Sequence, residues 1–340
     1  MTATAPTDLG LQIMSYREAL RLALREELVR DPRVFVMGEE VGVFDGAYKV
    51  TAGLLEEFGP DRIRDTPISE EGFVGAGVGA AMLGERPVVE IMTINFLLVA
   101  IDQVVNHAAK IGAMFGGQVR CPLVIRTPNG AGNQLTAQHS QSFDQYFAHV
   151  PGLKVVAPSN AADARGLLKS AIRHDDPVVF IENLRLYMEK GPVPLDAEPL
   201  TPIGRARVAR SGGDLTIVTH SYATVRALQA ADRLAQSHGV DVEVVDLRSL
   251  RPLDMETVAQ SVGKTNLALC IEEGWPTYGV SAELAARIQH ACFDDLDAPV
   301  ERLGMAEVPL PYSKPLETAA LPNEERVERA ILGMLGLAPR

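Results

Sequence analysis

Short segments rich in Val and Ile alternate with helix-like segments along the chain, and this alternation constrains the fold more than any other feature. Ser15 and Glu18 form a capping-box pair that predicts the start of a helix, and further helices are predicted over 96–115 and over 159–174, the last capped by Ser159. Strands alternating with helices in this way indicate a parallel sheet covered on both faces. Four segments of the first half are predicted to be buried strands: VFVMG (34–38), PVVEIM (87–92), PLVIR (122–126) and PVVFIE (177–182).

A proline-rich stretch divides the chain. Residues 191–204, GPVPLDAEPLTPIG, hold four prolines and little apolar periodicity, and they are predicted to be an interdomain linker. The sequence therefore predicts an α/β protein of two doubly wound domains, 1–190 and 205–340. In the second domain, strands are expected at 215–220, 240–247, 266–273 and 299–304, alternating with helices at 222–237, 254–262 and 278–290.

Charge and cysteine content exclude several classes of function. The net charge is −12 and neither half of the chain is basic, which argues against nucleic-acid binding or an anionic membrane surface. Cys121, Cys270 and Cys292 lie far apart, without disulfide, zinc or CxxC spacing, so we expect a reduced, cytoplasmic protein. The longest membrane-like stretch, 73–84, has 12 residues against the ~20 needed to span a bilayer.

The segment GAGVGA (75–80) fits the loose dinucleotide-binding pattern but lacks the strand that should precede its first glycine. Glycine inside a helix costs about 1 kcal/mol relative to alanine. We therefore interpret these glycines as the contact face of a helix that lies very close to a neighbouring element.

Four loops place polar or conformationally special residues where predicted strands end. They are GEEV (38–41), DTPISEEGF (65–73), EIMTINF (90–96) and PNGAGNQLTAQHSQ (128–141). In open α/β sheets ligands bind at the carboxyl ends of strands, so these loops are the candidate site.

These loops carry a family resemblance. The motifs GEEVGVFDGAYKVTAGL, RIRDTPISEEGF, RPVVEIMTINF, PNGAG and AQHSQ, followed by VDLRSLRPLDMETV, SVGKTN and IEEGW, resemble the β subunit of the thiamine-diphosphate-dependent first component of 2-oxo acid dehydrogenase complexes. The resemblance covers about residues 12–330 and is greatest to the pyruvate dehydrogenases. It implies a pyrimidine-binding domain followed by a transketolase C-terminal-like domain.

The resemblance also implies that the active site is shared between two chains. Thiamine enzymes hold the diphosphate through a metal site with a GDG…NN signature, and this chain has no GDG. The chain is therefore expected to bind the aminopyrimidine half of thiamine diphosphate. The diphosphate and Mg²⁺ would lie on an α subunit in an α₂β₂ heterotetramer.

The family motifs assign roles to four residues. Glu70 corresponds to the carboxylate on the pyrimidine ring nitrogen, and Phe96 to the aromatic residue packed on that ring. His139 corresponds to the active-site histidine, and Glu39 to an acid that links two active sites by proton relay. Glu71 stands where relatives carry a small or apolar residue, and we expect it to point away from the cofactor.

Relatives also hold a structural potassium ion near the end of the helix that follows the third strand. His174 and Asp176 stand where relatives often carry Asp and Asn. The matching positions here are Leu123, Ala171, Ile172, His174 and Asp176.

The resemblance implies oxidative decarboxylation of pyruvate and transfer of the acetyl group to lipoamide on a dihydrolipoyl acyltransferase core. The C-terminal domain would form the dimer and dock on that core. Three alternatives stay open: an acetoin dehydrogenase β subunit, a branched-chain 2-oxo acid dehydrogenase β subunit, and a non-catalytic assembly module.

Overall fold

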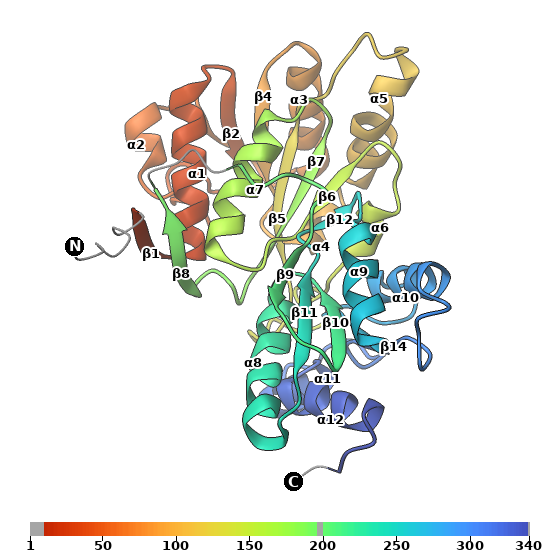
Figure 1. The fold of residues 1–340 in the computed structure, drawn as a ribbon. Coiled ribbons are helices and arrows are strands. Elements are labelled where there is room, and N and C mark those ends of the chain that lie inside the picture. The colour runs from red at the N-terminus through yellow and green to blue at the C-terminus, as the bar shows by residue number, and fades with distance from the viewer. Residues whose placement is uncertain (1–9, 196–199, 339–340) are drawn as a thin grey trace, which may run out of the picture.

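The computed structural model describes residues 10–195 and 200–338, which form two α/β domains, one above the other in Figure 1. The first domain contains a seven-stranded sheet of order β12-β6-β7-β5-β4-β2-β3. All its strands except β12 run parallel. They are β2 (Val34–Gly38), β3 (Ile63–Asp65), β4 (Arg86–Glu90), β5 (Val124–Asn129), β6 (Lys154–Val156), β7 (Val178–Asn183) and β12 (Ser249–Arg251).

Helices cover both faces of this sheet because its strands are apolar on both sides. Val36 and Val88 face one layer of helices, whereas Met37 and Val89 face the other. The first layer is built mainly from α1 (Tyr16–Arg30), α2 (Leu54–Phe58) and α7 (Ala161–Arg173). The second holds α3 (Glu70–Met82), α4 (Ile94–Leu97), the π-helix η1 (Gln103–Ala108), α5 (Ala109–Met114) and α6 (Asp144–Ala148).

The second domain repeats this plan around a five-stranded sheet of order β14-β13-β10-β11-β9. Its longest helix, α8 (Ser221–His238), is amphipathic. No helix within the described ranges has the length and apolar character to cross a bilayer. The strands are β9 (Arg207–Arg210), β10 (Leu215–Thr219), β11 (Val242–Asp246), β13 (Ala268–Ile271) and β14 (Glu301–Leu303). The helices are α8 (Ser221–His238), α9 (Met255–Thr265), α10 (Val280–Ala291), α11 (Lys314–Ala320) and α12 (Glu324–Met334).

The predicted division between the domains needs two corrections. The predicted linker begins as a strand, because β8 (Lys190–Pro194) pairs antiparallel with β1 (Leu11–Ser15). Residues 196–199 of that linker lie outside the described residues. The second correction is β12, which follows the linker in sequence but pairs with β6 in the sheet of the first domain.

Two local predictions in the first domain are wrong. The predicted helix over 96–115 is interrupted, because α4 ends at Leu97 and the chain passes through a turn and η1 before α5. Asn160 rather than Ser159 caps α7, since its side chain accepts from the backbone N–H of Asp163. The Ser159 hydroxyl donates instead to Asp246 at 2.5 Å. The capping box of α1 is present as predicted.

Two of the three glycines in the segment GAGVGA, Gly75 and Gly77, lie where α3 contacts its neighbours, as the sequence indicated, whereas the prediction is wrong for Gly79. A Cβ atom on Gly77 would lie 2.8 Å from a methyl group of Val89 on β4, and one on Gly75 would lie 3.1 Å from the Gln103 amide oxygen. Gly79, two residues after Gly77, lies on the exposed side of the helix, and a Cβ atom there would have no neighbour within 4 Å. Close approach of α3 to the sheet therefore depends on Gly77.

We predict that Gly77→Ala destabilises the protein although alanine is the better helix former. Overpacking of this kind costs about 1–3 kcal/mol, against a gain in helix propensity of ~1 kcal/mol. The matched control is Gly79→Ala, which gains the propensity without the clash. Urea unfolding should show a lower midpoint for the first variant and an unchanged or higher midpoint for the second. An increase for both would contradict the close-packing interpretation.

The two domains meet at the carboxyl ends of their strands. Asn183, which ends β7, donates to the Glu273 carboxylate beyond β13 at 2.5 Å. Asp144 on α6 lies 3.8 Å from the Nε2 atom of His220. Burial raises the pKa of Glu273 to about 7, against the opposing effects of Arg185 and Asn183. Burial also raises the pKa of Asp144 to about 6 and lowers that of His220 to about 4. Near pH 7 the His220 imidazole is therefore neutral and the Glu273 carboxyl group is about half protonated, whereas Asp144 is mostly ionised.

The raised pKa of Glu273 predicts a pH-dependent stability. A carboxyl group whose pKa is higher in the folded state makes folding less favourable as pH rises from its ordinary value, 4.5, toward about 7. Wild type should therefore lose stability relative to Glu273→Gln between about pH 5 and about pH 8. Asp144 and His220 are common to both proteins, so their effects largely cancel in the difference. Thermal unfolding across this range is the measurement, and a constant difference in melting temperature would refute the prediction.

Candidate active site

The four predicted site residues all lie at the carboxyl edge of the larger sheet. Glu39 follows β2, Glu70 begins α3 after β3, Phe96 lies in α4 after β4, and His139 lies in the loop after β5. The strands that precede them are neighbours, in the order β5-β4-β2-β3. The parallel arrangement thus brings residues separated by 100 positions to one edge, where open α/β sheets bind ligands.

Glu39 and Glu70 form a pair of buried carboxyl groups. They are 9% and 7% exposed, whereas the adjacent Glu71 is exposed. Burial raises the pKa of Glu39, and the neighbouring carboxyl group of Glu70 raises it further. Within the described residues the Oε1 atom of Glu39 has no hydrogen-bond partner. The pair can therefore hold a proton and still offer a buried acceptor to a ligand.

The first turn of α3 explains why Glu70 is placed there. A carboxylate at a helix N-terminus is favoured by the unpaired backbone N–H groups and the helix dipole. The side chain of the preceding Ser69 makes no capping hydrogen bond. Glu70 is the buried one of the two acidic residues in this first turn, so its carboxyl group is the one enclosed at the sheet edge.

Phe96 and His139 are in direct ring contact. Their centroids are 5.2 Å apart and their planes are nearly perpendicular, which is a favourable edge-to-face arrangement. Phe96 is partly buried and His139 is exposed. The Asn95 side chain donates to Gln141 at 2.5 Å and so links the two loops that carry these rings. The Phe96 ring and the His139 imidazole therefore lie together at the same edge of the sheet as Glu39 and Glu70.

A buried ion network that the sequence does not predict connects three neighbouring strands, β4, β5 and β7. Arg126 on β5 donates to Glu182 on β7 at 2.5 and 2.8 Å and to Glu90 on β4 at 2.5 Å. The Tyr187 hydroxyl donates to Glu182 at 2.7 Å. Burial favours the neutral form of Arg126, but the two carboxylates raise its pKa above the ordinary value. The sequence does contain a sign of this network, because β4, β5 and β7 each carry a charged residue among their Val and Ile residues.

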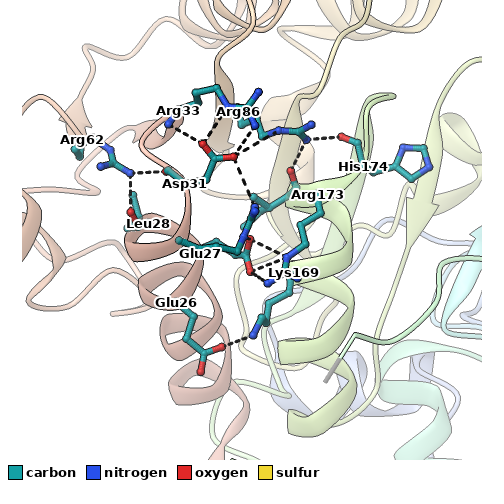
Figure 2. A network of polar contacts seen from close by, with 12 residues as sticks. Glu26, Glu27, Leu28, Asp31, Arg33, Arg62, Arg86, Lys169, Arg173 and His174 are labelled. Atoms are coloured by element: carbon teal, nitrogen blue, oxygen red, sulfur yellow. Dashed lines mark hydrogen bonds and ion pairs between the residues drawn. The ribbon is translucent and has the colours of Figure 1, made fainter. Parts of the chain in front are cut away.

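The positions expected to hold potassium already have protein partners. Figure 2 shows the Arg86 guanidinium beside Asp31 and His174. One of its nitrogens donates to the carbonyl oxygens of Ile172 and His174 at 2.9 and 3.1 Å. The other expected groups are also engaged: the carbonyl of Leu123 with the N–H of Val178, the carbonyl of Ala171 with the N–H of His174, and the carboxylate of Asp176 with Arg120 at 3.5 Å.

The same view shows how α7 is fixed to α1. Glu26 on α1 accepts from Lys169 at 2.7 Å, and Glu27 accepts from Arg173 at 2.7 Å (Figure 2).

No group of three or more His, Cys, Asp or Glu residues within the described ranges is arranged to hold a metal ion.

Comparisons with known proteins agree with this architecture. Residues 12–190 match the transketolase pyrimidine-binding domain, and residues 204–327 match the transketolase C-terminal domain. A solved structure titled split gene transketolase, inactive beta4 tetramer, superposes with a TM-score of 0.73 over 96% of this chain and 99% of that chain. Its sequence identity is 22%, so this similarity concerns the fold alone.

The sequence relatives are more specific. The chain is 53% identical to the pyruvate dehydrogenase E1 component subunit beta-1 of Arabidopsis thaliana, covering 94% of this chain and 89% of the relative. It is 52% identical to the corresponding subunit of Rickettsia conorii, covering 94% and 97%. Identity to the subunit of Drosophila melanogaster is 51%, covering 98% and 92%. The chain therefore belongs to the family of pyruvate dehydrogenase E1 component beta subunits, built from the transketolase pyrimidine-binding and C-terminal domains.

Proposed function

We propose that this chain is the β subunit of a pyruvate dehydrogenase first component and works with an α subunit in an α₂β₂ heterotetramer. The reaction oxidises pyruvate to an acetyl group and CO₂, and it reduces the disulfide of lipoamide, which receives the acetyl group on sulfur. The acceptor is lipoamide on a dihydrolipoyl acyltransferase core. The observation that carries the proposal is the buried Glu39–Glu70 pair at the same sheet edge as the Phe96–His139 contact.

The site chemistry fits the aminopyrimidine half of thiamine diphosphate. When bound, this cofactor supplies the electron sink that decarboxylation of a 2-oxo acid requires. Glu70 would hold a proton in a hydrogen bond to the pyrimidine ring nitrogen, and its burial keeps water from competing for that bond. Phe96 would pack on the ring and orient it. We assign the diphosphate and Mg²⁺ to the α subunit.

Two further groups would act around the reacting atoms. The imidazole of His139 is exposed and lies against Phe96, where it can bind the substrate carboxylate and move a proton during acyl transfer. The unpaired Oε1 of Glu39 and its raised pKa suit a group that exchanges a proton with Glu70. We therefore propose that Glu39 passes protons to and from Glu70 as part of a proton relay.

We predict that Glu70→Gln lowers the rate of acetyl transfer by about 10²- to 10⁴-fold, because general acid–base catalysis contributes this much. The assembled tetramer should remain intact by native mass spectrometry. Glu71→Gln is the matched control, since Glu71 is adjacent but exposed, and it should retain nearly full activity. Unchanged activity in Glu70→Gln would favour the alternative of a non-catalytic assembly module.

The substrate is tested on the same reconstituted tetramer. Steady-state rates should be highest with pyruvate, compared with acetoin and 2-oxoisovalerate. A preference for acetoin or for the branched-chain 2-oxo acid would overturn the assignment of substrate while leaving the role of Glu70 in place. Native mass spectrometry of the chain purified from its own cells should also find a second chain with a GDG…NN motif.

Potassium is a finer part of the proposal. Backbone carbonyl oxygens suit a hard monovalent cation, and each carries two lone pairs, so those already bonded to Arg86 keep one for an ion. Leu123, Ala171, Ile172, His174 and Asp176 would hold it. We predict a higher melting temperature in K⁺ than in choline at equal ionic strength, and a smaller difference in Asp176→Ala. Equal melting temperatures in the two salts would refute a bound potassium ion.

A further inference from the structure

The loop that carries His139 has an unusual backbone. This segment, residues 130–142, lies between β5 and α6, and we call it the histidine loop. Gln134 and Thr136 have φ values of +57° and +65°, in the left-handed region that residues with a Cβ atom rarely adopt. The N–H of His139 approaches the carbonyl of Thr136 at 3.4 Å. Such a conformation persists only where the surroundings hold it.

The C-terminal domain supplies a buried carboxylate to this loop. Glu317 on α11 is 1% exposed. Its Oε1 atom accepts from the backbone N–H of Gly132 at 2.9 Å, and both oxygens lie 3.2–3.3 Å from the N–H of Gln134. Among the described residues these two N–H groups are the only hydrogen-bond donors to its carboxylate. A buried carboxylate without a cationic side chain depends on such donors, so the loop and Glu317 satisfy each other.

The same part of the C-terminal domain also packs on the loop. Ala131, next to the first donor, is 3% exposed. It lies in a cluster with Met305, Leu310, Ala320 and Leu321, all from the C-terminal domain. Gly132 has a φ of +100°, and a Cβ atom there would lie 2.9 Å from the Arg185 guanidinium. The start of the histidine loop is thus fixed by apolar packing on one side and by a carboxylate on the other.

We propose that Glu317 is a positioning residue for the histidine loop, so that the C-terminal domain sets the location of His139 from outside the pyrimidine-binding domain. The backbone is left-handed at Gly132 and Gln134, so their N–H groups point away from the carbonyl groups of the loop. The Glu317 carboxylate accepts from both N–H groups. It thereby selects one loop conformation, in which the imidazole meets Phe96. The catalytic consequence of this inference rests on the proposed role of His139, whereas its effect on loop order does not.

The test compares three substitutions at Glu317 in the reconstituted heterotetramer. Glu317→Ala removes both acceptors, Glu317→Gln keeps one oxygen acceptor, and Glu317→Asp keeps the charge but shortens the reach. Glu307→Gln is the control, because Glu307 lies in the same domain and its carboxylate accepts from the backbone N–H and the hydroxyl of Thr277 rather than from the histidine loop. If the alanine variant fails to fold, the Asp and Gln variants provide the comparison.

Hydrogen exchange is the first measurement. Glu317→Ala should increase amide exchange in peptides covering 130–142 by about tenfold or more, with β10, β11 and β13 unchanged. The second measurement is kinetic: kcat for acetyl transfer should fall by about tenfold, while the Kd for thiamine diphosphate should change less than about twofold. Glu317→Asp should lie between wild type and alanine in both measurements, and Glu307→Gln should match wild type.

Several results would overturn the proposal. Unchanged exchange in the histidine loop would show that Glu317 does not hold it. Increased exchange spread through the whole C-terminal domain, or equal losses of kcat and cofactor affinity, would show a general structural role. A wild-type tetramer with no pyruvate activity would refute the proposed function instead, and the exchange result would still decide the inference about the loop.

Discussion

Arg126 holds together the part of the sheet on which the candidate site is built. Its guanidinium lies buried between Glu182 and Glu90 and so connects β5 to both of its neighbours. Burial alone would lower the pKa of Arg126, but the two carboxylates beside it raise that pKa above the ordinary value. Burial raises the pKa of Glu90. Removal of one partner from a buried pair of this kind typically costs about 3–5 kcal/mol. The strand ends at the site are therefore held by ionic bonds as well as by the sheet.

This rigid edge supports side chains that come from different loops. Glu39 and Glu70 follow strands on one side of β4, whereas His139 follows β5 on the other side. The C-terminal domain approaches the same edge with the ends of its own strands, through Glu273 and His220. Two sheets thus present their carboxyl ends to each other. A loop between them, such as the histidine loop, contacts groups from both domains.

Much of this arrangement could be predicted from the sequence. The Val- and Ile-rich segments predicted the parallel strands. The family motifs predicted the site residues that the structure places at one edge of the sheet, Glu39, Glu70, Phe96 and His139. The failures have physical reasons. The helix over 96–115 is interrupted near the site, where a uniform apolar pattern hides a turn and a π-helix. The roles of Arg126 and Glu317 depend on contacts across 56 and 185 positions, which no local pattern records. Ser159 was a plausible cap, but its neighbour Asn160 makes the bond.

The position of β12 in the first sheet has a consequence for biosynthesis. β6 has β7 on one side and β12 on the other, and β12 lies beyond the stretch between the domains. When β6 leaves the ribosome, its outer edge is therefore open, with unpaired N–H and C=O groups that can pair with another chain. Translation at about 5–20 residues per second leaves this edge uncovered for on the order of 5–20 s. The three-residue length of β6 limits that exposure, because so short an edge offers little for a foreign strand to bind.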